Sequence, residues 1–155
     1  MNHEIHPLTP EKENPWRERA MQFIREGRIQ GYLAYSDGNI IGWCNANDKK
    51  NFSALKQNIN IDLEIDNESE KIKSVVCFLV APDMRGKKIA TKMLERICAD
   101  AQANGYDLVE GYPPAGEWNM YAAHHGTTAL FEKCGFEIHK QNGSGCIMRK
   151  KLKNV

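Results

Sequence analysis

A cluster of basic residues around one glycine is the part of this sequence best suited to bind a ligand. Arg85, Lys87 and Lys88 surround Gly86, between an apolar strand-like run and a helix-like segment. A helix start presents unpaired N–H groups and a partial positive charge, so basic side chains are unfavourable there unless an anion is bound. Gly86 would let a ligand approach the backbone closely. The pattern therefore predicts an anion site, with pyrophosphate as the natural candidate, the alternative being solvated basic side chains at a loop.

The elements that must position this cluster are a core strand and a long helix. Residues 74–80 form a continuous apolar run rich in β-branched side chains, which predicts a buried central strand. Residues 87–104 place apolar side chains on one face at helical spacing, and Gly105 is the expected terminator. Residues 106–110 read as a second core strand. A strand, a helix and a strand in this order predict a crossover with parallel strands.

The other expected elements flank this crossover and add antiparallel partners to the sheet. Asp37-Gly38-Asn39 is a strong hairpin signal between two strand-like runs. The polar stretch 47–71 reads as a loop or edge region. Together these patterns predict an α/β (α+β mixed) fold with a mixed sheet. The remaining elements are a strand over 4–8, a helix over 9–25, strands over 32–35 and 40–44, a helix over 127–134, and strands over 136–140 and 146–151.

Length and charge restrict the class of protein. The chain has 155 residues, which suits one domain over 1–155. Lys and Arg total 21 against 20 Asp and Glu, so a net charge of +1 gives no argument for nucleic acid or a membrane surface as partner. No apolar run approaches the ~20 residues that span a bilayer. The N-terminus lacks a signal-peptide pattern, so we expect a cytoplasmic protein.

The cysteines and histidines do not form a metal-binding pattern. The five cysteines are odd in number, widely spaced and without a CxxC pair, which argues against a disulfide framework and a structural zinc site. His124 and His125 are adjacent, and adjacent side chains on a helix do not face one metal. We therefore expect no metal. The two histidines would instead support the turn at Gly126 or contact a substrate.

Two segments together resemble the signatures of the GNAT N-acetyltransferases. Residues 85–90, Arg-Gly-Lys-Lys-Ile-Ala, look like the acetyl-CoA motif R/Q-x-x-G-x-G/A after a core strand. Residues 129–137 resemble the second signature, L-Y-E-K-x-G-F. The resemblance covers about 32–152, most of the chain. Further landmarks resemble one bacterial branch of the family: Gly42-Trp43-Cys44, Cys77-Phe78-x-Val80, Glu110-Gly111-Tyr112-Pro113 and Met148-Arg149.

The resemblance implies a GNAT-like mixed sheet, flanked by helices, that splays open at the strand ending near Val80. Acetyl-CoA would lie in the cleft as co-substrate. Its pantetheine arm would pair with strand backbone, its pyrophosphate would meet the amides at the start of the helix, and Lys133 could reach a phosphate. The implied cofactor-binding residues are Phe78, Leu79, Val80, Arg85, Gly86, Lys87, Lys88, Ile89, Ala90, Thr91 and Lys133.

Three departures from the family pattern concern the cofactor site and catalysis. Lys88 stands at the usual middle glycine, where it could crowd the phosphate or neutralise it. Phe131 stands where a tyrosine often acts as general acid, so the thiolate would take its proton from Tyr112, Tyr121 or water. The central strand carries no carboxylate. Glu110, at the end of the neighbouring strand, ranks first among possible bases, with a structural carboxylate as the alternative.

The resemblance implies an acyltransferase that moves the acetyl group of acetyl-CoA to a primary amine by direct attack on the thioester. The acceptor would be a small-molecule or peptide amine. A homodimer is one option, because dimers are common for this fold. The alternative from another class is a catalytically weak or inactive acyl-CoA-binding sensor or scaffold, which the departures at Lys88 and Phe131 favour.

Overall fold

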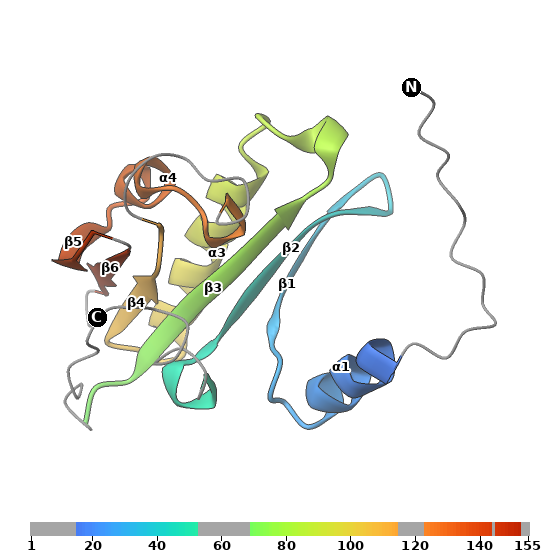
Figure 1. Ribbon diagram of the computed structural model, residues 1–155, viewed down its shortest axis with the longest axis horizontal. Helices are drawn as coiled ribbons and strands as arrows, with labels where there is room; N and C mark the ends of the chain where they lie inside the picture. Colours follow the sequence, from blue (N-terminus) through green and yellow to red (C-terminus); the bar gives the residue numbers. More distant parts are fainter. Residues whose placement is uncertain (1–14, 53–68, 115–122, 144, 153–155) are drawn as a thin grey trace.

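The computed structural model describes residues 15–52, 69–114, 123–143 and 145–152. Its centre is a six-stranded sheet with the strand order β1-β2-β3-β4-β6-β5 (Figure 1). The strands are β1 (Gly31–Ser36), β2 (Asn39–Asp48), β3 (Ile72–Val80), β4 (Leu108–Gly111), β5 (Glu137–Gln141) and β6 (Cys146–Lys151). The helices are α1 (Pro15–Arg25), α3 (Ile89–Ala103) and α4 (Thr128–Lys133), with short 3₁₀ turns η1 (Lys49–Asn51), η2 (Pro82–Met84) and η3 (Ala123–His125).

The crossover predicted from the sequence is confirmed. β3 and β4 are parallel neighbours joined through α3, and the other strand pairs are antiparallel. The mixed sheet flanked by helices is the predicted fold class. The buried side of α3 packs into the main core through Met93, Leu94, Ile97, Cys98 and Ala101.

The predicted start of α3 was two residues too early. The helix begins at Ile89, because Lys88 has a φ of 62° and lies in the left-handed region. Left-handed backbone cannot continue into a right-handed helix. Lys87 and Lys88 therefore belong to the turn before the helix, where the anion site was expected.

The first hairpin has the geometry that its sequence demands. Asp37 and Gly38 both have positive φ, 49° and 78°, as a two-residue turn between twisted strands requires. β2 is longer than expected and continues to Asp48, into the stretch read as loop or edge. Asn47 explains this difference, because its buried side chain donates to the carbonyl oxygens of Gly27 and Arg28 and so fits a polar residue into the strand.

The sheet opens along β3. β3 pairs with β4 only from Ile72 to Val75, whereas its pairing with β2 continues to Val80. Opposite β2, Asn45 pairs with Cys77 and Ala46 with Val75, so Val76 is the extra residue of a β-bulge. The predicted splay is thus confirmed. The strand was expected to be buried throughout, but beyond Val75 its burial is incomplete: Phe78 is buried, whereas the side chain of Leu79 is 57% exposed.

The N-terminal expectations are tested only in part. α1 ends at Arg25 and Gly27 follows with a φ of 71°, as predicted. The start of this helix before residue 15 and the strand over 4–8 lie outside the described residues. No described helix combines the length and hydrophobicity that crossing a bilayer requires.

Candidate functional site

The open edge of β3 is the first part of the candidate site. Beyond Val75 the strand has a partner strand on one side only among the described residues, so backbone N–H and C=O groups face the space where β4 has ended. Phe78 turns its ring inward, with its centroid 6.2 Å from that of Phe131, while Leu79 is exposed. An extended ligand that carries amides can pair with such an edge as an added strand would.

The turn between β3 and α3 is the second part. Gly86 has a φ of 73°, and a Cβ built there would meet nothing within 4 Å. The amides of Gly86, Lys87 and Lys88 donate no hydrogen bond within the described part of the chain. The first amides of α3, which begin at Ile89, have no acceptor inside the helix. The turn therefore offers successive free amides to an anion.

Positive charge surrounds these amides. Arg85, Lys87 and Lys88 are all exposed, and α3 has no acidic residue in its first turn. Nε of Arg85 donates to the carbonyl oxygen of Val80 at 3.2 Å, which ties the turn to the end of β3. The predicted anion site therefore lies next to the open edge of β3, because the basic turn follows directly after that strand.

The bulge in β3 is held from outside the sheet by a histidine. Nδ1 of His125, in η3, lies 2.9 Å from the carbonyl oxygen of Val76. The His125 ring also lies against that of His124, with centroids 3.9 Å apart. Burial lowers the pKa of His125 below its usual value, His124 lowers it further, and the bond to Val76 opposes both effects. Sequence reasoning missed this contact, because a bulge leaves no recognisable local pattern.

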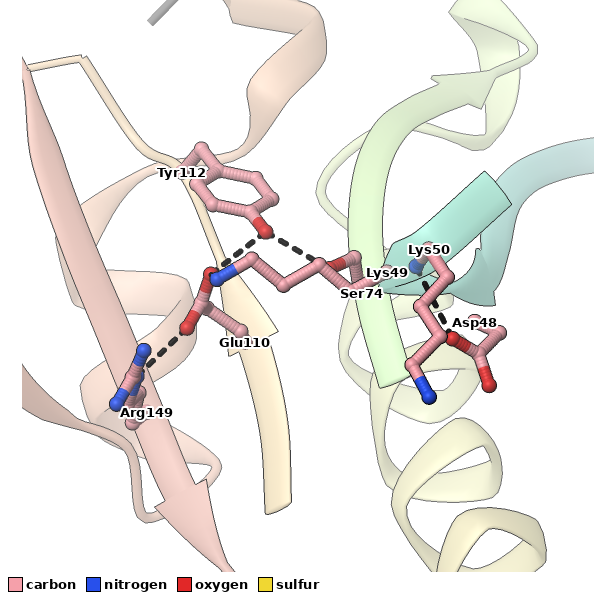
Figure 2. Close-up of polar contacts among 7 residues, drawn as sticks. All are labelled: Asp48, Lys49, Lys50, Ser74, Glu110, Tyr112 and Arg149. Carbon is pink, nitrogen blue, oxygen red and sulfur yellow. Dashed lines mark hydrogen bonds and ion pairs between the residues drawn. The ribbon is translucent and has the colours of Figure 1, made fainter. Parts of the chain in front are cut away.

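Glu110 lies in a buried polar cluster (Figure 2). Its Oε1 accepts a hydrogen bond from the Tyr112 hydroxyl at 2.7 Å and lies 2.8 Å from Nζ of Lys49. Its Oε2 accepts from Nε of Arg149 at 2.6 Å. The side chain has no exposed surface. Both carboxylate oxygens are therefore engaged, which favours the structural role that the sequence left open beside the catalytic one.

Tyr112 joins this cluster to β3. Its hydroxyl has one proton, which it donates to Glu110, so Oγ of Ser74, 2.7 Å away, is the donor in the second contact. Tyr112 is 5% exposed. Ser74 pairs with Glu110 just before the sheet opens. The structure thus brings both predicted catalytic residues together at the closed end of the splay, while Tyr121, the other proton donor considered, lies outside the described residues.

Phe131 is a core residue. Its ring is fully buried and contacts Phe136 edge to face, with centroids 5.1 Å apart. A Cβ at Gly111 would lie 2.1 Å from its ring, so the ring packs directly over the end of β4. Lys133 is exposed at the end of α4, and no contact among the described residues joins it to the basic turn.

One buried polar atom near the bulge has no partner among the residues that the structure describes. Oδ1 of Asn45 is buried and accepts no hydrogen bond within the described part of the chain. Asn45 pairs with Cys77, the residue after Val76. A buried acceptor without a donor is energetically costly at this position.

Comparison with known proteins agrees with this geometry. The model of the acetyltransferase (GNAT) family matches residues 2–136. The chain belongs to the GNAT acetyltransferase family. The resemblance read from the sequence is therefore confirmed, and the family is one of acyltransferases, as predicted. A search of curated proteins found no match.

Solved GNAT structures share the fold at low sequence identity. An N-acetyltransferase from Staphylococcus aureus Mu50 is 16% identical with a TM-score of 0.60, over 92% of this chain and 79% of that chain. A phosphinothricin acetyltransferase from Sinorhizobium meliloti, solved with acetyl-CoA, is 18% identical with a TM-score of 0.57, over 90% and 70%. The ribosomal-protein-S18-alanine N-acetyltransferase from Escherichia coli is 15% identical with a TM-score of 0.56, over 90% and 79%.

Within the described residues of this GNAT chain, no group of three or more His, Cys, Asp or Glu side chains could hold a metal ion. The five cysteines are free, and all but Cys77 are buried. Burial raises the pKa of Cys44 and of Cys77, so these thiols stay protonated near neutral pH.

Proposed function

We propose that this GNAT chain transfers the acetyl group of acetyl-CoA to a primary amine by direct attack of the amine on the thioester. The observation that carries the proposal is the continuity of the open β3 edge with the basic, amide-rich turn before α3. An edge that can pair with amides and a turn that can bind phosphates are the two surfaces that a pantetheine arm and a pyrophosphate require.

The residues present fit this co-substrate. The backbone of Phe78, Leu79 and Val80 would pair with the arm. The amides from Gly86 to Thr91 would hold the pyrophosphate, with Arg85, Lys87 and Lys88 supplying charge. The free amides and the open space at Gly86 support this assignment. Lys88 is exposed, and its side chain does not come within 4 Å of a Cβ built at Gly86, which favours neutralisation of a phosphate over crowding.

The proposed reaction mainly requires that the acceptor amine and the acetyl thioester be positioned next to each other. Acetyl-CoA, when bound, supplies an activated acetyl thioester. The protein would hold an amine beside that group and orient a backbone N–H near Leu79 or Val80 toward its carbonyl oxygen. Both small-molecule amines and peptide N-termini are candidate acceptors.

A second candidate function is binding of acyl-CoA without efficient transfer. Two observations favour it: the Phe131 ring is buried in the core and has no proton to give, and both oxygens of Glu110 are engaged. β3 itself carries no carboxylate. The same cofactor site would then serve a sensor or scaffold.

Calorimetric titration with acetyl-CoA, and with free CoA in parallel, tests the cofactor site. We expect one site with micromolar affinity, about −8 kcal/mol. Release of CoA is then measured with spermidine, kanamycin, a free amino acid and an alanine-starting peptide. CoA release that depends on one of these amines supports the enzyme, and binding without release supports the sensor. Absence of acetyl-CoA binding by the folded protein would overturn both.

A further inference from the structure

The contact between His125 and Val76 determines the state of the imidazole ring. A carbonyl oxygen can only accept a hydrogen bond, so the proton of the neutral ring is on Nδ1, 2.9 Å from the Val76 oxygen. Nε2 then carries the free lone pair. It makes no hydrogen bond within the described part of the chain. A ring fixed through Nδ1–H with a basic Nε2 is the arrangement of a positioned proton acceptor.

The place of this ring in the cleft follows from the direction of β3, if the proposed function holds. Phosphates at the turn after Val80 lie at the C-terminal end of the open edge. An arm that follows this edge runs back toward Val76, where pairing with β4 begins. The acetyl end of the ligand would therefore reach Val76, the bulge residue whose carbonyl oxygen contacts His125. Asn45 on β2 pairs with Cys77, the next residue along β3.

We propose that Nε2 of His125 accepts the proton that the acceptor amine must lose. The ammonium group of the acceptor gives one proton to Nε2 and becomes a neutral amine, leaving an imidazolium ring. The amine nitrogen bonds to the acetyl carbon as the carbon–sulfur bond breaks. The departing thiolate takes the proton from the imidazolium, which restores the neutral ring, and the second amine proton passes to solvent. Protons and electron pairs balance without a further reactant.

The surroundings of His125 keep the ring neutral near pH 7. Burial and His124 both lower its pKa, and the bond to Val76 only partly opposes them. The strand packed against η3 carries Lys73 and Cys77 as its titratable side chains, and α4 beyond the turn carries Glu132 and Lys133. Among His124 and these four side chains, only His124 contributes to the pKa shift of His125. A neutral ring is the form that can accept a proton.

The substitution His125→Gln separates proton transfer from support of the bulge. A glutamine amide can donate to the Val76 oxygen but cannot take a proton at neutral pH. With the panel amine that releases CoA fastest, we expect kcat/KM to fall roughly 10²- to 10⁴-fold. The affinity for acetyl-CoA should stay within about twofold. Full activity in His125→Gln, with loss only in His125→Ala, would show a purely structural role and overturn the proposal.

The pH profile gives an independent readout. In the wild-type protein kcat/KM should rise with pH through a midpoint below the usual histidine value of about 6.5, and His125→Gln should lack this step. His139→Gln, at an exposed histidine on β5, is the matched control and should keep both the activity and the step. His124→Gln should move the midpoint upward, since a like-charged neighbour is removed. A step that persists unchanged in His125→Gln would overturn the proposal.

A readout without acceptor separates this inference from the proposed function. Nitrogen-15 NMR of the histidine rings should show the proton of neutral His125 on Nδ1, and acetyl-CoA should shift the Nε2 resonance. A proton on Nε2, or no shift on saturation with acetyl-CoA, would overturn the role of His125 even if no panel amine reacts. Failure of the wild-type protein to bind acetyl-CoA would instead refute the proposed function, and with it this role.

Discussion

Glu110 and Arg149 face each other across β4 and β6, and Nε of Arg149 donates to Oε2 of Glu110 at 2.6 Å. On the other side of the carboxylate, Nζ of Lys49 lies 2.8 Å from Oε1. One buried carboxylate thus joins η1, β4 and β6 at the closed end of the splay. The structural and the catalytic role considered for Glu110 can be separated by experiment. Loss of a structural role lowers the free energy of unfolding, whereas loss of a catalytic role lowers turnover.

Glu110→Ala should destabilise the fold strongly. Removing one partner of a buried ion pair leaves charge uncompensated, here on Lys49 and Arg149, and costs about 3–5 kcal/mol. Urea unfolding monitored by circular dichroism measures the free energy of unfolding. Glu95→Ala, on the exposed side of α3, is the control and should change it by less than about 0.5 kcal/mol. If Glu110→Ala kept its stability but lost turnover, Glu110 would act in the reaction.

Gly86→Asp should weaken acetyl-CoA binding at least about 100-fold, because it places an anion at the proposed phosphate site. Gly86 has a φ of 73°, so any side chain strains the turn. Gly86→Ala shares this strain without the charge and is the matched control. Calorimetry compares the two variants. Equal affinity in both folded variants would refute the assignment of the phosphates to this turn.

Lys88→Gly should stabilise the protein by up to about 1 kcal/mol. A non-glycine residue in the left-handed region costs about 1–2 kcal/mol. Glycine removes this cost but also raises the conformational entropy of the unfolded chain, which offsets part of the stabilisation. The φ of Lys88 is 62°. Lys87 is not among the described residues with positive φ, so Lys87→Gly should lower stability instead. Chemical denaturation checks both changes. Destabilisation by Lys88→Gly would mean that its side chain contributes more than its backbone costs.

Tyr32 should make stability fall at alkaline pH. Burial raises the pKa of Tyr32 to about 12, and Asp100 adds to the shift. The unfolded value is about 10, so the stabilisation is complete below pH about 10 and is lost as pH rises to about 12. Unfolding experiments across this window should show a shallower decline for Tyr32→Phe. Tyr35→Phe, exposed on the same strand, should leave the slope unchanged.

The sequence by itself determined the elements whose signals are local. The apolar period of α3, the glycine after it, and the Asp37-Gly38 turn each act within a few residues, so the chain positions of these elements were predictable. The strand–helix–strand order then determined the parallel pair, because crossovers follow a rule of topology. The basic cluster around Gly86 was recognisable for the same reason: it directly follows a strand and precedes a helix.

Only the tertiary structure decided how far each strand pairs and which distant groups meet. The bulge at Val76 depends on the register between β2 and β3, and its contact with His125 joins residues 49 apart in the chain. The engagement of Glu110 by Arg149 likewise requires β6 to lie beside β4. Such contacts arise when separate elements pack together, and residue types at either end carry no signal of the other. The sequence therefore located the turn proposed to bind the cofactor, whereas packing placed His125 beside Val76 and engaged both oxygens of Glu110.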